Sequence, residues 1–220
     1  MSPAWSDKDI GNTVRKIVVW AFAGLVWAGA VGIGAQKLLL YELTPGQLAE
    51  PSPRWPADSA LPREPGRFTL VVFAHPDCPC TKATLVELGK LAARLEGRMS
   101  ALVEFAKPEA MADEVRHSSR WHEAGAVPGV VIGFDTGDVE VRRFGVATSG
   151  QALLYDGHGN LVFSGGITSA RGHEGPNAGS DAVVALVNGS RERFHNPVFG
   201  CSLRNPGAAE LGGNSGWKRP

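Results

Sequence analysis

Residues 68–91 read FTLVVFAHPDCPCTKATLVELGKL and change hydrophobic period partway along, with two cysteines at the change. The first seven residues, 68–74, form a nearly continuous apolar run, which is typical of a strand buried on both faces. Apolar side chains then recur at intervals of three and four residues, the spacing of one helix face: Leu85, Leu88, Ala92 and Leu95. The stretch predicts a buried strand that leads directly into a helix.

Cys78 and Cys80 lie at this junction, and the carboxyl ends of strands in open α/β sheets are where active sites form. Pro79 suits the first helical position because it lacks an N–H group, which would place Cys78 at the helix cap. Unpaired N–H groups and the positive end of the helix dipole favour a thiolate there. We expect the thiol pKa to fall below about 8.5, and Lys82 to add to this if it turns toward the sulfur.

A disulfide between Cys78 and Cys80 would close a very small ring, and such strain makes a bond easier to reduce. The pair therefore suits a working disulfide better than a structural one. Two alternatives stay open: buried thiols without chemistry, and a site for Cu(I) or another soft metal ion. In the metal alternative the ligands are drawn from Cys78, Cys80, His75, His173 and Cys201.

The rest of the domain follows the same mixed pattern of strands and helices. We expect a strand over 101–105, a helix over 112–124, an extended piece over 129–135, a short helix over 139–144, a hairpin of 151–156 with 161–164, and a helix over 180–189. Gly157 to Asn160 supply the turn of the hairpin. The order predicts an α/β fold whose later strands are antiparallel.

The N-terminal region contains 19 consecutive uncharged residues, 17–35, about the length that crosses a bilayer as a helix. We assign residues 17–36 to a transmembrane helix; a cleaved signal peptide is the alternative. Arg15 and Lys16 precede the span, so the positive-inside rule places residues 1–16 in the cytoplasm and the remainder outside. In a bacterium the outer compartment is the periplasm or its equivalent, where cysteine pairs can oxidise.

Prolines after the transmembrane segment indicate where the folded domain begins. Residues 45–66 contain six prolines, which exclude a regular helix or central strand. We therefore expect 37–66 to be an extended stalk and the folded domain to cover 67–203. Residues 204–220, rich in Gly, Asn and Pro, are expected to be a disordered tail.

From Phe68 to Gly189 the chain resembles the thioredoxin-like superfamily, in particular the membrane-tethered TlpA and alkyl-hydroperoxide-reductase-like branch and the RedB proteins. Two segments carry the resemblance: the strand–cysteine–helix stretch quoted above, and DTGDVEVRRFGVATSGQALLYDGHGNLVFSGG at 135–166. The resemblance implies a thioredoxin-like fold, with a central mixed sheet flanked by helices, and thiol–disulfide exchange.

The chain departs from this family in two places. The family motif is Cys-x-x-Cys, whereas this chain has Cys-x-Cys, and the family's cis-proline would fall near Gly150, where no proline stands. That proline helps to position a substrate strand and discourages metal binding, so its absence favours the metal alternative. Sco-type copper proteins share the fold, but the histidine that they place before the later strand is not matched at 148–150.

Three residues far along the chain are further candidates. In the thioredoxin-like arrangement, the glycine-rich loop 164–179 lies beside the cysteine helix, where Arg171 would stabilise a thiolate and His173 would move a proton or bind a metal. Cys201 would serve as a resolving thiol or third ligand. For the loop, the alternative is a flexible surface loop. For Cys201, the alternatives are a small buried side chain and a disulfide between two molecules.

Charge balance narrows the choice of partner. The chain has 22 basic and 22 acidic residues, which excludes a strongly basic nucleic-acid binder. Our first hypothesis is a membrane-anchored protein, without cofactor, that exchanges electrons with thiol- or disulfide-bearing proteins; Cys78 attacks and Cys80 resolves. A copper-binding or copper-delivery protein is the alternative, and a tethered interaction module without chemistry is a third possibility.

Overall fold

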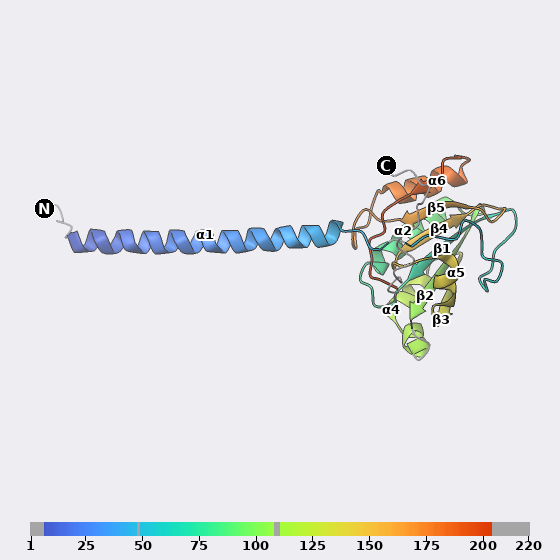
Figure 1. Cartoon of the computed structure of the whole chain (residues 1–220), viewed down its shortest axis with the longest axis horizontal. Coiled ribbons are helices and arrows are strands. Elements are labelled where there is room, and N and C mark those ends of the chain that lie inside the picture. Colours follow the sequence, from blue (N-terminus) through green and yellow to red (C-terminus); the bar gives the residue numbers. More distant parts are fainter. Residues whose placement is uncertain (1–6, 48, 108–110, 204–220) are drawn as a thin grey trace. The chain divides into compact units, whose positions relative to one another are not determined.

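The computed structural model describes residues 7–47, 49–107 and 111–203, and the chain divides into two units, 1–43 and 44–220. The first unit contains one helix, α1 (Asp7–Leu43), drawn in blue in Figure 1. Its stretch from Gly11 to Leu43 is long and apolar enough to cross a membrane, and its side chains are exposed. The helix continues past the predicted end at 36, since no proline occurs before Pro45, so 37–43 belong to α1 and not to the stalk.

The second unit is built on one mixed sheet of six strands in the order β3-β2-β1-β4-β5-β6. Three neighbouring strands pair in parallel: β1 (Phe68–Ala74), β2 (Met99–Lys107) and β3 (Val130–Thr136). The antiparallel hairpin predicted from the Gly-His-Gly-Asn turn is β4 (Gln151–Tyr155) and β5 (Leu161–Gly166). β4 pairs antiparallel with β1, and the two-residue β6 (Phe194–His195) pairs parallel with β5.

Among the described residues of this unit, five helices accompany the sheet: α2 (Thr81–Arg94), α3 (Ala112–Arg116), α4 (Ser119–Gly125), α5 (Val139–Phe144) and α6 (Ala178–Val187). The helix expected over 112–124 is thus two helices. Ser118 separates them because its backbone is extended and its hydroxyl accepts a hydrogen bond from the Trp121 N–H at 3.2 Å. This side-chain cap starts α4 as a separate helix.

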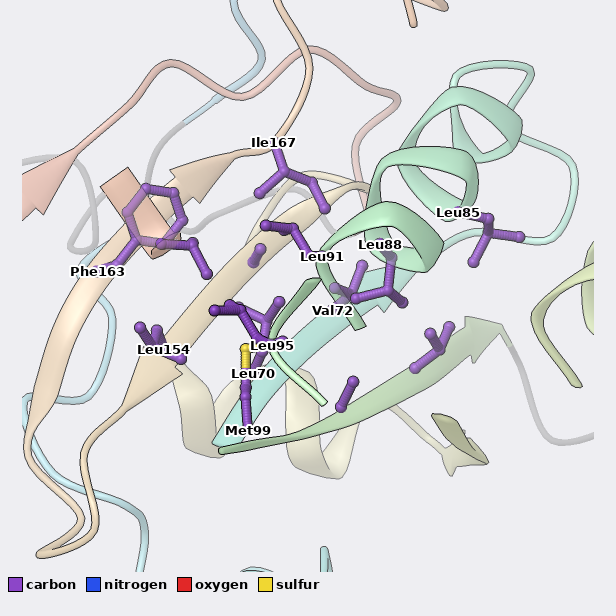
Figure 2. Close-up of a cluster of buried hydrophobic side chains, with 14 of the residues drawn as sticks. Leu70, Val72, Leu85, Leu88, Leu91, Leu95, Met99, Leu154, Phe163 and Ile167 are labelled. Atoms are coloured by element: carbon purple, nitrogen blue, oxygen red, sulfur yellow. The ribbon is translucent and has the colours of Figure 1, made fainter. Parts of the chain in front are cut away.

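Strand β1 is buried on both faces, as its continuous apolar run predicts. On one face, Leu70 and Val72 pack in a cluster with α2, α4 and α6, part of which Figure 2 shows around Leu88. On the other face, Val71 and Phe73 pack with α5. Successive side chains of a strand point to opposite faces, so one strand supplies two cores.

The proline-rich segment is not a free stalk, because it packs along the second core. The Ser52 N–H donates to the Phe144 carbonyl at 3.0 Å, and the Trp55 N–H donates to the Gly159 carbonyl at 2.8 Å. The Trp55 ring meets Phe144 and Tyr155 edge-on, at centroid distances of 5.1 and 5.3 Å. Proline prevents a regular element, but an extended segment still covers apolar surface. The folded unit therefore starts at Thr44 and not at Arg67.

Candidate functional site

Two consecutive turns join β1 to α2 and hold the cysteine pair. The Cys78 N–H donates to the His75 carbonyl at 3.1 Å, and the Thr81 N–H donates to the Cys78 carbonyl at 3.1 Å. α2 begins at Thr81, with Cys80 as its N-cap. The expectation that Cys78 caps the helix and Pro79 opens it is therefore wrong by two residues, because these residues are used in the turns.

The two cysteines of the pair are both buried. Cys78 is 1% exposed and Cys80 is 7% exposed, while Cys201 is half-buried, and all three are free thiols. Cys78, the cysteine that we expect to attack, is thus the more buried of the pair. The cover over Cys78 comes from a distant part of the chain.

That cover is the segment 200–203, which lies antiparallel to residues 147–149. The Ser149 N–H donates to the Cys201 carbonyl at 2.8 Å, and the Leu203 N–H donates to the Ala147 carbonyl at 2.7 Å. Thr148 and Ser202 form the bridge between them. This pairing brings the Cys201 N–H to 3.4 Å from the Cys78 Sγ, so the structure places Cys201 against the cysteine pair.

Ser149 is a site residue that the sequence interpretation missed. Its hydroxyl accepts a hydrogen bond from the His75 N–H at 2.9 Å, lies 3.3 Å from the Thr81 hydroxyl, and interacts with the Cys78 thiol. The sequence drew attention to this loop for the proline that it lacks. The serine next to Gly150 was the feature of the sequence from which a hydroxyl at the site could have been predicted.

Hydrogen bonds to its sulfur make Cys78 the most acidic of the three thiols. Burial opposes ionisation and would raise the pKa of Cys78, but donors outweigh it: the Cys201 N–H and thiol, the Cys80 N–H and Ser149. The pKa of Cys78 therefore lies below its usual value, because hydrogen bonds to a charged form stabilise that form.

The two neighbouring thiols are shifted the other way. Burial raises the pKa of Cys80, and the charge and hydrogen bond of Cys78 raise it further. Burial and the same neighbour raise the pKa of Cys201 to about 11. Two protonated thiols thus stand beside one thiol that ionises more readily, which is the arrangement of a nucleophile with potential resolving partners.

Arg171 lies among the sulfurs, where its charge favours the thiolates of Cys80 and Cys201. Its Nη1 donates to the Gly200 carbonyl at 2.8 Å and its Nη2 donates to the Thr44 carbonyl at 3.4 Å. The guanidinium therefore also fixes the segment that carries Cys201.

The other supporting candidates are placed differently. His173 is exposed, with its Nδ1 2.9 Å from the Arg171 carbonyl, and Lys82 is exposed on the first turn of α2. His75 uses its Nδ1 to accept the Asp77 N–H at 3.1 Å. Over the described ranges 7–47, 49–107 and 111–203, no group of three or more His, Cys, Asp or Glu side chains is arranged to hold a metal ion. Of the donors named in the metal alternative, the three cysteine thiols interact with one another, whereas His173 is exposed.

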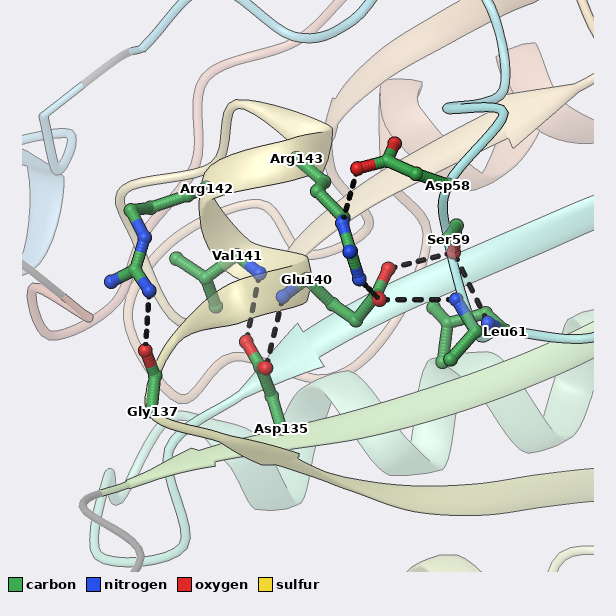
Figure 3. Close-up of polar contacts among 10 residues, drawn as sticks. Asp58, Ser59, Leu61, Asp135, Gly137, Glu140, Val141, Arg142 and Arg143 are labelled. Atoms are coloured by element: carbon green, nitrogen blue, oxygen red, sulfur yellow. Dashed lines mark hydrogen bonds and ion pairs between the residues drawn. The ribbon is translucent and has the colours of Figure 1, made fainter.

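A second polar cluster, also missed from sequence, lies on the α5 face of the sheet. Glu104, Asp135 and Glu140 are all at most 5% exposed. Asp135 accepts the N–H groups of Glu140 and Val141 at 2.9 and 2.8 Å, and Glu140 binds Arg143 at 2.6 Å (Figure 3). Burial and then the charges of the other two carboxylates raise the pKa of Glu104 to about 8, so it is largely protonated at neutral pH.

The strand order, the antiparallel β4–β5 hairpin and the cysteines at the end of β1 define a thioredoxin-like fold.

No family model matches the sequence, and no curated protein matches it. Among solved structures, the chain is similar to a hypothetical protein of Sinorhizobium meliloti 1021, with 21% identity over 73% of this chain and 93% of that chain and a TM-score of 0.54. It is also similar to an uncharacterized conserved protein of Geobacillus kaustophilus, with 20% identity over 76% and 95% and a TM-score of 0.53. The exposed lipoprotein thioredoxin of Streptococcus pneumoniae TIGR4 matches at 16% identity over 56% and 84%, with a TM-score of 0.42. At these identities the likeness is one of fold.

Proposed function

We propose that the chain is a membrane-anchored thiol–disulfide redox protein whose nucleophile is Cys78. The observation that carries this proposal is the Cys78 sulfur itself, which stands at the end of β1, has a lowered pKa and touches two further thiols. A lowered thiol pKa increases the fraction of thiolate, and the thiolate is the attacking species in disulfide exchange.

The exchange runs in two balanced steps. The Cys78 thiolate attacks one sulfur of a partner disulfide, forms a mixed disulfide and releases the other partner sulfur. A second thiol of the chain then attacks the Cys78 sulfur and releases the partner as a dithiol. Two electrons and two protons pass to the partner, and the chain is left with one disulfide; the reverse sequence oxidises a partner dithiol.

The groups that cover the Cys78 sulfur are polar, and they are not part of the hydrophobic core. Neither hydrophobic cluster of the described residues includes Cys78 or Cys80. The atoms over the Cys78 sulfur include the Cys201 amide and the Ser149 hydroxyl, groups that are paired through loop and segment contacts. Because Cys78 is 1% exposed, a protein partner reaches the sulfur only when this cover moves aside.

The anchor and the compartment form part of the same proposal. α1 would hold the chain in the membrane, and Arg15 and Lys16 would keep the N-terminus in the cytoplasm. The folded unit would then act in the oxidising compartment on thiol- or disulfide-bearing proteins. A C-terminal alkaline phosphatase fusion, active only outside the cytoplasm, should be active; an inactive fusion that is expressed and membrane-bound would contradict this orientation.

The catalytic proposal is tested with the full chain in detergent micelles. Cys78→Ser should abolish dithiothreitol-driven reduction of insulin disulfides, whereas Ser119→Ala, an exposed serine on α4, should retain it. Undiminished activity of Cys78→Ser would overturn the proposal. Stoichiometric Cu(I) retained by the anaerobic protein, and lost when both Cys78 and Cys80 are serine, would instead favour a soft-metal carrier. Three slowly reacting thiols with ordinary pKa values would favour an interaction module.

A further inference from the structure

We infer that Cys201, and not Cys80, is the thiol that resolves the mixed disulfide at Cys78, so that the working disulfide joins the end of β1 to the C-terminal segment. The inference rests on the proposed function, since it names the second thiol of the same site. It stands on the contact between Cys201 and Cys78 and on the way in which the segment 200–203 is fixed.

The first step concerns the local geometry of the Cys78–Cys80 pair. Pro79, with its fixed φ, separates the two residues, and Cys80 has helical backbone angles of φ −70° and ψ −21°. The Cys80 carbonyl is already bound by the Thr84 N–H at 3.2 Å as part of the first turn of α2. Closing the small ring across this proline would distort the start of the helix, and such strain disfavours the bond.

Cys201 reaches the same sulfur without that distortion. The segment 200–203 approaches Cys78 from the side of residues 147–149. Cys201 is 123 positions away from Cys78 in the sequence. A disulfide between distant residues closes no small ring, and it stabilises the fold by constraining the unfolded chain. The geometry therefore favours Cys78–Cys201 as the disulfide that forms readily.

The segment is also held in place before reaction. Residues 201 and 203 are paired with 149 and 147, and the Gly200 carbonyl accepts from Arg171. Gly200 itself packs so closely on the Ser149 carbonyl that a Cβ there would collide with it. A thiol held next to its target loses little freedom on reacting, which accelerates an intramolecular attack.

The charge state of Cys201 changes at the right step. Burial raises the pKa of Cys201, and the hydrogen bond and negative charge of Cys78 raise it further, so Cys201 is protonated beside the Cys78 thiolate. When Cys78 enters a mixed disulfide its charge is gone, while Arg171 remains and favours the Cys201 thiolate. Cys201 then loses its proton, attacks the Cys78 Sγ and expels the partner sulfur, which takes up a proton; the bond formed is Cys78–Cys201 and the bond broken is Cys78–partner.

The test is peptide mapping of the full chain in detergent after brief treatment with oxidised glutathione and trapping with N-ethylmaleimide. Trypsin leaves Cys78 and Cys80 in peptide 68–82 and Cys201 in peptide 194–204, so the two disulfides differ in mass. We expect the two peptides to be joined, with the maleimide on Cys80. An internal disulfide in 68–82, with the maleimide on Cys201, would overturn the inference and leave the proposed function standing.

Two variants separate the outcomes further. Cys80→Ser should still form the joined peptides, whereas Cys201→Ser should accumulate Cys78 bound to glutathione, with release of glutathione slowed at least tenfold. Equal release rates in Cys201→Ser and the unaltered chain would contradict the inference. If Cys78 reacts with glutathione neither in the unaltered chain nor in the two variants, the proposed function itself fails. Circular dichroism of each variant checks that it is folded. The peptide mapping of the unaltered chain does not depend on any variant, so it tests the inference even if a variant fails to fold.

Discussion

The backbone N–H of Cys201 donates to the Sγ of Cys78 at 3.4 Å, although 123 residues separate them. The contact exists because 200–203 pairs with 147–149, the loop that also carries Ser149. A donor, a neighbouring thiol and a hydroxyl thus converge on one sulfur. The redox chemistry that we propose for the chain depends on that convergence.

The first prediction concerns thiolate formation. The pKa of Cys78 should lie below that of an ordinary thiol, and Cys78 should ionise before the other two thiols, because hydrogen bonds stabilise its charged form. The absorbance of thiolates near 240 nm, followed against pH in the reduced full chain, should show a first step below pH 9 that Cys78→Ser removes. Ser149→Ala should move that step upward, and the exposed Ser119→Ala should not; a step unchanged in Ser149→Ala would argue against the hydroxyl contact.

Arg171→Gln tests the guanidinium among the sulfurs. The variant removes a charge that lowers the pKa of Cys80 and Cys201, so the later thiolate steps should move to still higher pH. It also removes the hydrogen bond to Gly200, and Cys78–Cys201 closure should slow by roughly tenfold, equivalent to about 1.4 kcal/mol. The exposed Arg191→Gln is the matched control, and equal closure rates in both variants would contradict a positioning role.

Gly200→Ala should separate the C-terminal segment from its partner loop. A methyl group there meets the Ser149 carbonyl, so 200–203 must shift and the Cys201 amide moves away from Cys78. The pKa of Cys78 should rise, and oxidation should yield less Cys78–Cys201 disulfide. Gly89→Ala is the control: on α2 its methyl would make only ordinary contact with Val127, and the helix should gain up to about 1 kcal/mol. Identical thiol titrations for the two variants would rule out the packing constraint.

Glu104 makes the stability of the folded unit depend on pH. Its pKa is about 8 in the folded chain against 4.5 as the reference, so the folded state binds more protons than the unfolded state between these values. Stability from this group is therefore fully present below pH 4.5 and falls as pH rises to about 8, by up to about 1.4 kcal/mol per unit. Glu104→Gln mimics the neutral acid and should remove that fall.

The measurement for Glu104 is urea unfolding of both proteins from pH 5 to pH 8.5, followed by circular dichroism. The difference in unfolding free energy should be small at pH 5 and should increase in favour of the variant toward pH 8. A difference that is constant across the range would show that Glu104 has an ordinary pKa.

Trp55→Ala tests the packing of the proline-rich segment. Trp55 contacts Phe144 and Tyr155, so its loss opens the second core, and the free energy of unfolding should fall by about 3 kcal/mol, the lower end for such truncations. Trp27→Ala, an exposed side chain of α1, should leave the unfolding of the second unit unchanged. If Trp55→Ala is as stable as the parent, the segment behaves as the free stalk that its prolines suggest.

The local parts of the fold could be read from the sequence. The apolar run at 68–74, the helical spacing after it and the Gly-rich turn at 157–160 predict β1, α2 and the β4–β5 hairpin, and all three are present. Such elements follow from patterns a few residues long, since side-chain periodicity and turn preferences act locally. The same patterns predicted one continuous helix over 112–124. The structure has two helices there, because the Ser118 side chain accepts a hydrogen bond that starts α4.

The sequence by itself determined that two cysteines follow a buried strand, that a helix with a long uncharged stretch precedes the folded unit, and that the fold is α/β. Only the tertiary structure decided that Cys201 lies against Cys78, that Ser149 interacts with the same sulfur, and that Trp55 joins the core. The physical reason is distance along the chain: these contacts arise from where whole segments come to rest against the sheet, and no pattern within a single segment encodes that position.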